Sequence, residues 1–182
     1  MARVPYVQRD QMPPDKLGIY DRIASTRGSV QNVFAALLNS PEAAEAVTGV
    51  GEYLRYNCPL DPAIRETAIL ATAREMGNRY EWAQHEPVAR EAGVRDEAIE
   101  AIRSGKAPMG LPAKEGVFAQ GARELTRDGE LTEKTLAAIE HLLGTRQAVD
   151  FVVLVSYYGM VARIISTFQV DFDDWLDPET GF

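Results

Sequence analysis

The chain has 182 residues, of which 46% are hydrophobic and 25% are charged, an ordinary composition for one globular domain. Its 27 acidic residues exceed its 19 basic residues and give a formal net charge of −8. This acidic surplus argues against a nucleic-acid partner, because binding to a polyanion depends on basic side chains that neutralise phosphates.

The sequence also predicts a cytoplasmic protein that does not cross a membrane. Residues 1–16 lack the apolar core of a secretory signal. The most apolar stretch, residues 151–162, is shorter than the roughly 20 residues that a helix needs to span a bilayer. Cys58 is the only cysteine, which excludes an internal disulfide, a Cys-x-x-Cys redox motif and a thiolate-rich zinc site. We expect Cys58 to be an inert, partly buried thiol.

Three helices are predicted in the first third of the chain. Apolar residues at helical spacing indicate a short helix within residues 13–28. Ser29 is a suitable cap for a second helix that reaches Asn39. Ser40-Pro41 places a capping side chain before a proline at the first helical position, so a third helix begins there and extends towards Tyr56.

The middle of the chain begins with the same kind of signal. Asp61-Pro62 predicts the start of a helix that stops at Gly77. Two further helices are expected, one from about Arg79 to near Gly93 and one over residues 96–104. Two prolines and a glycine predict a loop over residues 106–112.

The last third of the chain is also predicted to be helical. One helix covers residues 113–127, and Thr132 caps a second that stops at Gly144. Thr145 caps a long apolar helix that reaches about Phe168. Residues 151–155 are rich in β-branched side chains and would suit a buried strand by propensity, but the apolar pattern continues well beyond them, which favours the helix.

The elements therefore predict an all-α fold, a single-domain antiparallel helical bundle. The expected organisation is an N-terminal extension over residues 1–12, a helical domain over 13–170 and an acidic C-terminal tail over 171–182. The helix that contains residues 151–165 is apolar on most sides and must be covered by its own domain or by another subunit. We therefore expect a homo-oligomer.

Residues 65–87 contain the strongest candidates for chemistry. Glu81 and His85 are four residues apart on a predicted helix, so their side chains share one face and can form a hydrogen bond. A carboxylate beside an imidazole fixes its orientation and favours its charged form, as general acid–base catalysis near neutral pH requires. Pro87 lies inside the same helix and predicts a bend or a freed backbone acceptor close to His85.

This segment resembles the signature of the carboxymuconolactone decarboxylase and alkyl hydroperoxidase D superfamily. The pattern of the peroxidase branch is Glu, eleven residues, Cys-x-x-Cys, three residues and His. Aligned without a gap, the pattern places Glu66 at the glutamate and His85 at the histidine, whereas Asn78 and Glu81 stand at the two cysteines. The Glu81-x-x-x-His85 pair is similar to the decarboxylase branch, in which a glutamate can precede the histidine by four residues.

The resemblance continues in residues 88–99 and 157–163 and covers most of residues 30–170. It implies a helical bundle of the alkyl hydroperoxidase D-like type and an assembly of three or six subunits. Peroxide reduction in the peroxidase branch needs one thiolate to attack and a second thiol to resolve the product. Because both cysteines are missing, we expect no thiol peroxidase activity.

The leading hypothesis is a cofactor-independent and metal-independent lyase or isomerase for a small carboxylated lactone or keto acid. When such an acid loses carbon dioxide, its own conjugated carbonyl holds the electrons, so the protein supplies orientation and a proton donor. His85 would give the proton and Glu81 would orient it. Glu66 would be a second relay or a carboxylate that faces the substrate.

Three other residues are candidates for substrate binding: Arg65, which can bind a carboxylate bidentately, Asn78 and Trp82. Arg65, Trp82 and Glu66 also have structural interpretations. Arg65 can pair with the adjacent Glu66, and Trp82 can serve only for packing. Glu66 can stabilise the helix dipole from the first turn of its helix.

Two other functions remain open at this stage. The chain is either a member of the peroxidase branch without thiol activity or a non-catalytic oligomeric binding protein with a decayed site. In the second case, His85 and Glu81 would point into packed core with no cavity beside them.

Overall fold

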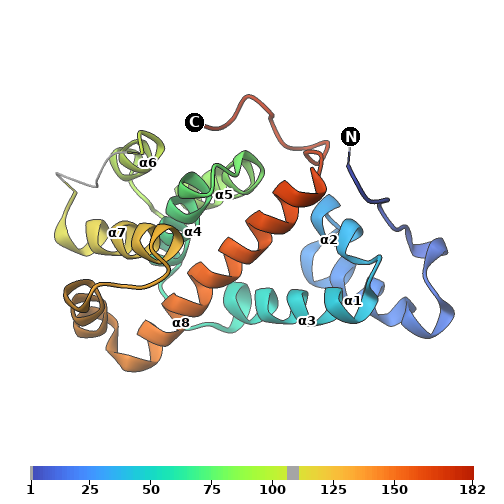
Figure 1. Cartoon of the computed structure of the whole chain (residues 1–182), viewed down its shortest axis with the longest axis horizontal. Helices are drawn as coiled ribbons and strands as arrows, with labels where there is room; N and C mark the ends of the chain where they lie inside the picture. The colour runs from blue at the N-terminus through green and yellow to red at the C-terminus, as the bar shows by residue number, and fades with distance from the viewer. Residues whose placement is uncertain (1, 106–110) are drawn as a thin grey trace. The chain divides into compact units, whose positions relative to one another are not determined.

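The computed structural model describes residues 2–105 and 111–182, apart from the side chains of Ala113 and Lys114. All regular structure in these residues is helical, which confirms the all-α prediction (Figure 1). Most of the loop predicted over residues 106–112 lies outside the described residues.

Contacts divide the chain into two compact units. One comprises the chain up to Cys58 together with Ile164–Trp175, and the other comprises Pro59–Arg163 together with Leu176–Phe182. The domain boundaries predicted from the sequence, at residues 12 and 170, stay predictions.

The first unit contains three α-helices and three short helical turns. The helices are α1 (Leu17–Arg27), α2 (Asn32–Leu37) and α3 (Pro41–Glu52), and the turns are η1 (Arg9–Gln11), η2 (Pro14–Lys16) and the π-helical η3 (Tyr53–Asn57). Gly28 ends α1 with a φ of 79°, a left-handed conformation that favours glycine, so this predicted stop is confirmed. Ser40 precedes α3 as predicted, although its side chain makes no capping hydrogen bond.

The prediction that Ser29 caps the second helix is wrong. The N-cap position of α2 is Gln31, and its side chain makes no capping hydrogen bond. Instead, the backbone N–H of Asn32 donates to Oδ1 of Asp173 over 2.9 Å. A carboxylate from the far end of the chain thus satisfies a free N–H group at the helix start, where carboxylates are favoured.

The second unit contains α4 (Pro62–Glu75), α5 (Arg79–Glu91), α6 (Asp96–Arg103), α7 (Ala113–Arg127) and most of α8 (Glu133–Phe168). Helix α4 contacts α5, α6 and α7 and is buried without interruption from Glu66 to Ala73. Asp61 caps it as predicted, because its carboxylate accepts from the N–H groups of Ala63 and Ile64 over 2.9 and 3.3 Å. Helix α5 runs through Pro87 and continues to Glu91.

Helix α8 is broken at Gly144, whose φ of 76° and ψ of 161° are not helical. The predicted stop at Gly144 is therefore confirmed, whereas the Thr145 hydroxyl, predicted to cap the next helix, donates to Oε1 of Glu140 over 2.5 Å. Residues 151–155 are helical, which rules out the alternative strand.

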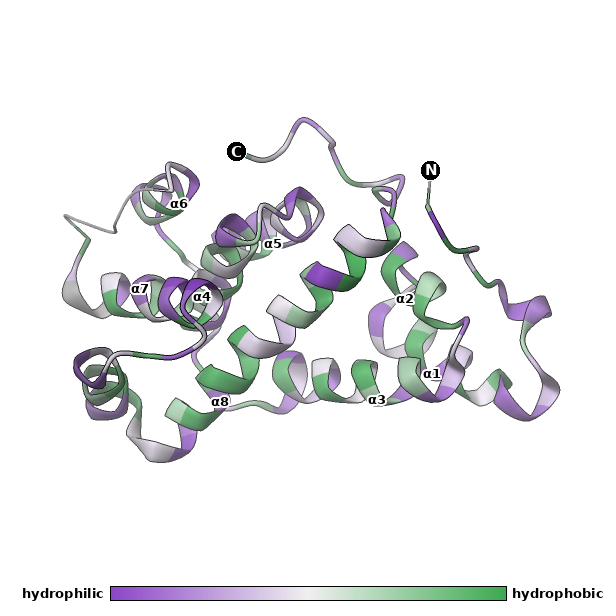
Figure 2. Cartoon of the chain, viewed as in Figure 1, coloured by the Kyte–Doolittle hydropathy of each residue, from purple (hydrophilic) through white to green (hydrophobic). Residues whose placement is uncertain are grey.

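Helix α8 is long and apolar enough to span a membrane, judged by length and composition alone. Its apolar pattern continues on both sides of residues 151–162, the most apolar stretch of the sequence (Figure 2). However, 61% of its most apolar 18-residue window is buried inside the chain, as is usual for a core helix.

Candidate active site

Helices α4 and α5 bring Glu66, Glu81 and His85 together in the second unit. Glu66 is the fifth residue of α4, so it lies beyond the first turn, and the interpretation that it faces the N-terminal dipole there is wrong. Asn78 caps α5 by accepting the backbone N–H of Glu81 over 2.9 Å. This cap fixes the first turn of the helix that carries Glu81 and, four residues later, His85.

The closest partner of His85 is Glu66. Nδ1 of His85 lies 2.7 Å from Oε2 of Glu66, which is hydrogen-bond distance, whereas Nε2 lies 3.6 Å from Oε2 of Glu81. The exposed fractions of the His85, Glu66 and Glu81 side chains are only 5%, 3% and 7%. Glu66 thus lies closer to His85 than Glu81 does.

The charge of Glu66 fixes the tautomer of His85. Burial raises the pKa of Glu66, but the positive charge of protonated His85, the hydrogen bond from His85 and the contact with Arg65 together lower it below its usual value of 4.5. An ionised carboxylate only accepts hydrogen bonds, so Nδ1 of His85 carries a proton and donates it to Glu66. Nε2 is therefore the ring nitrogen that is able to exchange a proton with another group.

Tyr158 of α8 packs against His85. Their ring centroids are 5.0 Å apart and the rings are nearly perpendicular, at 88°. Tyr157 meets Tyr158 in the same edge-on manner at 5.3 Å, and both tyrosines are buried. These contacts place the tyrosine pair in the core and make Tyr158 one wall of the site. The sequence offered only its place on an apolar helix, so the contact with His85 was missed.

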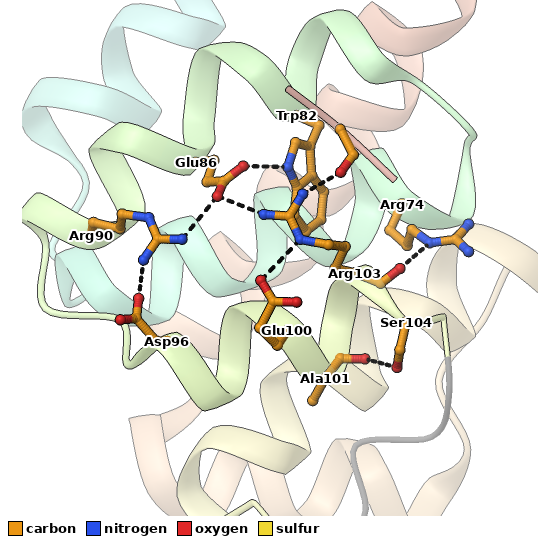
Figure 3. Close-up of polar contacts among 10 residues, drawn as sticks. Arg74, Trp82, Glu86, Arg90, Asp96, Glu100, Ala101, Arg103 and Ser104 are labelled. Carbon is orange, nitrogen blue, oxygen red and sulfur yellow. Dashed lines mark hydrogen bonds and ion pairs between the residues drawn. The ribbon is translucent and has the colours of Figure 1, made fainter. Parts of the chain in front are cut away.

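The three candidates for substrate binding make contacts within the protein. Arg65 donates from Nε to Oε1 of Glu66 over 3.1 Å, and 15% of its side chain is exposed. Asn78, besides capping α5, donates to the backbone oxygen of Ala162 over 3.1 Å. Trp82 is fully buried and donates from Nε1 to Glu86 over 2.7 Å (Figure 3). We call Glu66, Glu81 and His85 the acid–base cluster. Of the three candidates, Arg65 is the one whose side chain binds a carboxylate of this cluster.

A cavity of about 270 Å³ lies elsewhere in the second unit, lined mainly by apolar residues. Its lining comprises Ala63, Ile64, Thr67, Gly93, Val94, Arg95, Glu115, Phe118, Leu142 and Leu143. Helix α4 contributes Ala63, Ile64 and Thr67 to this cavity, whereas Glu66, Glu81 and His85 are not among its lining residues.

Across residues 2–105 and 111–182, no three side chains of the histidine, cysteine, aspartate or glutamate type are grouped in a way that would hold a metal ion. What the cluster provides is a charged carboxylate, a histidine with a fixed tautomer and a second carboxylate near its other nitrogen. This combination suits proton transfer.

The model of the carboxymuconolactone decarboxylase family matches residues 41–124, a range that includes Glu66, Glu81 and His85. This match supports the assignment of the chain to the carboxymuconolactone decarboxylase-like superfamily. The chain lacks the Cys-x-x-Cys pair of the peroxidase branch. A comparison with curated protein sequences finds no match.

Several solved structures share the fold of this chain at low sequence identity. A peroxidase-related protein from Ralstonia eutropha JMP134, with an alkylhydroperoxidase AhpD core, has a TM-score of 0.79 at 19% identity, over 100% of this chain and 98% of that one. A peroxidase-related protein from Silicibacter sp. TM1040 has a TM-score of 0.77 at 18% identity, over 95% and 92% of the two chains.

A third similar structure is a cysteine-to-alanine variant of the debrominase Bmp8 in complex with 2,3,4-tribromopyrrole. Its TM-score is 0.74 at 12% identity, over 94% of this chain and 91% of that one. Together these likenesses confirm an all-α fold of the alkyl hydroperoxidase D-like type.

Proposed function

We propose that this superfamily member is a cofactor-independent acid–base enzyme, a lyase or isomerase that acts on a small carboxylated lactone or keto acid. One observation carries the proposal: Glu66 holds Nδ1 of the buried His85 at 2.7 Å, which leaves Nε2 for proton transfer. A histidine oriented by a buried carboxylate is the arrangement that general acid–base catalysis uses.

In the decarboxylation, the bond between the substrate's carboxylate and the adjacent carbon breaks. The electron pair of that bond moves into the conjugated carbonyl, and carbon dioxide leaves. Protonated His85 then gives the proton on Nε2 to the substrate carbon and recovers one from water. Glu66 keeps the ring in place through its hydrogen bond to Nδ1. As an isomerase, His85 would instead remove a proton from one carbon and return it to another.

Glu81 has a different role in this proposal. Its Oε2 is 3.6 Å from Nε2 of His85, beyond a normal hydrogen bond but close enough for its charge to act on the ring. A carboxylate at this position can relay a proton back to Nε2 after the transfer. Arg65, which contacts Glu66, is the residue that we propose to bind the substrate carboxylate.

The direct test screens the purified protein against candidate lactones and keto acids and measures the release of carbon dioxide. With a turned-over substrate in hand, His85→Gln should reduce turnover by about 10²–10⁴-fold, the usual contribution of a general acid or base. His141→Gln is the matched control, because His141 is the only other histidine and is exposed. Equal turnover of His85→Gln and the parent would overturn the assignment of His85.

The burial of the cluster favours a second candidate, a non-catalytic binding protein. Glu66, Glu81 and His85 are all nearly inaccessible, and the cavity of about 270 Å³ is lined by other residues. In that case the Glu66–His85 contact would serve stability alone. No substrate in the screen would then be turned over, and His85→Gln would lower the unfolding midpoint.

Thiol peroxidase activity is not part of either candidate. Cys58 is the only cysteine and lies outside the Glu66–His85 segment. A thiol-dependent peroxide assay should therefore give the same background rate for the parent protein and Cys58→Ser. A rate that depends on Cys58 would contradict this.

We further propose that the protein is a cytoplasmic homo-oligomer, a trimer or hexamer as in the family it resembles. The described part of α8 supports association, because large apolar side chains remain exposed on it. Val149, Val153 and Met160 are exposed to 58%, 39% and 38%, at helical spacings of four and seven residues. Apolar side chains grouped on one helix face are typical of subunit interfaces.

A further inference from the structure

The C-terminal residues of the second unit lie on a surface formed by α4, α5 and α6. Arg79 donates to the backbone oxygen of Pro178 over 2.6 Å, and Arg103 donates to the backbone oxygen of Gly181. The ring of Phe182 meets the ring of Trp82 edge-on, with centroids 5.3 Å apart. Three consecutive helices thus supply contacts to one short extended segment, residues 178–182.

Arg74 and Arg103 of this surface also make contacts with other residues of α5 and α6 (Figure 3). Arg103 donates to Oε1 of the buried Glu86 over 2.6 Å, and its guanidinium carbon lies 4.9 Å from the centre of the Trp82 ring. Glu86 also accepts from Nε1 of Trp82 and from Arg90, over 2.7 and 2.9 Å. Trp82 and Arg103 are therefore positioned through Glu86 rather than by the segment that contacts them.

A further arginine, Arg74, contacts the face of the Phe182 ring. The guanidinium carbon of Arg74 lies 4.5 Å from the centre of the Phe182 ring, and Nε of Arg74 donates to the backbone oxygen of Arg103 over 2.8 Å. The Phe182 ring thus has a cation over its face and an indole at its edge.

We propose that Arg74, Arg79, Trp82 and Arg103 form a peptide-recognition site, and that residues 178–182 of this chain are its ligand, bound reversibly. Two of the contacts are hydrogen bonds to backbone oxygens, the usual way in which an extended peptide is held regardless of its sequence. Sequence preference comes from the aromatic ring and from Gly181. A Cβ atom on Gly181 would lie 2.8 Å from Nε of Arg79, so the position before the aromatic residue favours glycine.

Reversible binding follows from the small size of the ligand. Ordering a short segment costs conformational entropy residue by residue, and the segment is held by a few hydrogen bonds and one ring. When the segment dissociates, the Phe182 ring no longer covers the Trp82 ring. Trp82 is on α5, three residues before His85.

Trp82 is itself the reporter for the test. The chain has two tryptophans, and Trp175→Phe leaves Trp82 as the only one. In this background, Phe182→Ala should shift the Trp82 emission to longer wavelength and raise its quenching by acrylamide several-fold, because the indole becomes accessible. Glu179→Ala is the matched control, since Glu179 belongs to the same segment and is exposed. Its spectrum should equal that of the Trp175→Phe parent.

A synthetic peptide of residues 177–182 then tests recognition directly. Added to the Phe182→Ala variant, it should bind saturably and restore the emission of the parent, whereas the same peptide with alanine in place of phenylalanine should not. Far-UV circular dichroism checks that each variant keeps its helices. An unchanged emission in folded Phe182→Ala would show that the segment does not cover Trp82 in solution. Failure of the peptide to bind would overturn recognition in trans. Neither outcome depends on whether the protein is an enzyme.

Discussion

His85 is bound more closely by Glu66 of the neighbouring helix α4 than by Glu81 of its own helix. The distance from Nδ1 to Oε2 of Glu66 is 2.7 Å, and that from Nε2 to Oε2 of Glu81 is 3.6 Å. The two glutamates thus lie beside different nitrogens of the His85 ring. Glu66 fixes the orientation and tautomer of the ring, and Glu81 lies near Nε2, the nitrogen to which we assign the proposed proton transfer.

This division of roles predicts different tautomers in two matched variants. In the parent protein, Nδ1 of His85 should carry the proton at neutral pH. In Glu66→Gln, the side-chain amide can donate to Nδ1, which moves the proton of the neutral ring to Nε2. Glu81→Gln should keep the parent tautomer. Nitrogen-15 chemical shifts of the imidazole report the tautomer, and His141→Gln leaves His85 as the only histidine in the spectrum. The same tautomer in all three proteins would show that Glu66 does not control it.

A second prediction concerns stability in acid. Burial raises the pKa of Glu86, but hydrogen bonds from Arg90 and Trp82 and the charge of Arg103 lower it below the usual 4.5. The pKa of Glu66 is likewise lowered. A carboxyl group with a lower pKa in the folded than in the unfolded state contributes stability above its unfolded pKa and loses it as the pH falls through the folded value. The free energy of unfolding should therefore decrease as the pH falls below about 4.5.

Glu86→Gln isolates one part of this effect. At pH 7 the variant should be less stable by about 1–3 kcal/mol, because it leaves Arg103 and Trp82 without a charged acceptor. Its stability should also fall less steeply in acid than that of the parent, although Glu66 keeps part of the slope. Urea unfolding at several pH values measures both changes, with exposed Glu179→Gln as the control. Identical pH dependence of Glu86→Gln and the parent would contradict the assignment.

Local signals in the sequence were sufficient for most helix boundaries. Asp61 and Gly144 act through their own neighbours, by a capping carboxylate and by a backbone conformation that suits glycine, so the sequence alone located these ends. The start of α2 was misplaced for the opposite reason. Its first N–H is satisfied by Asp173, which is 141 residues away from Asn32, and no local pattern identifies such a partner.

The same distinction applies to the candidate site. The spacing of Glu81 and His85 along one helix predicted that they share a face. The hydrogen bond between His85 and Glu66 crosses from α5 to α4, and periodicity within one helix says nothing about which residues meet across two. Glu66 entered the prediction only through the family pattern, and the contact of Tyr158 with His85 was not anticipated at all.

The exposed apolar residues of α8 give a prediction about assembly. If this face is covered by another subunit, Val153→Glu places a charge in an apolar contact and should shift the protein to smaller species. Lys134→Gln changes the net charge by the same amount at another exposed position of α8, and it should leave the assembly unchanged. Sedimentation velocity distinguishes the two variants. A parent protein that sediments as a monomer would contradict the proposed oligomer, and a Val153→Glu variant as large as the parent would contradict this interface.

The break in α8 depends on glycine at position 144. Its φ of 76° and ψ of 161° belong to a region that is nearly exclusive to glycine, and residues forced into it lose about 1–3 kcal/mol. A Cβ atom at Gly144 would meet no other atom within 4 Å, so backbone conformation rather than crowding is the constraint. Gly144→Ala should therefore lower the free energy of unfolding by that amount. Gly49→Ala is the matched control, since Gly49 lies inside α3 with equal space for a Cβ atom, and alanine should stabilise the helix there by about 0.5–1 kcal/mol. Urea unfolding of both variants checks the opposite signs, and a stabilised Gly144→Ala would mean that the two parts of α8 join into one continuous helix without cost.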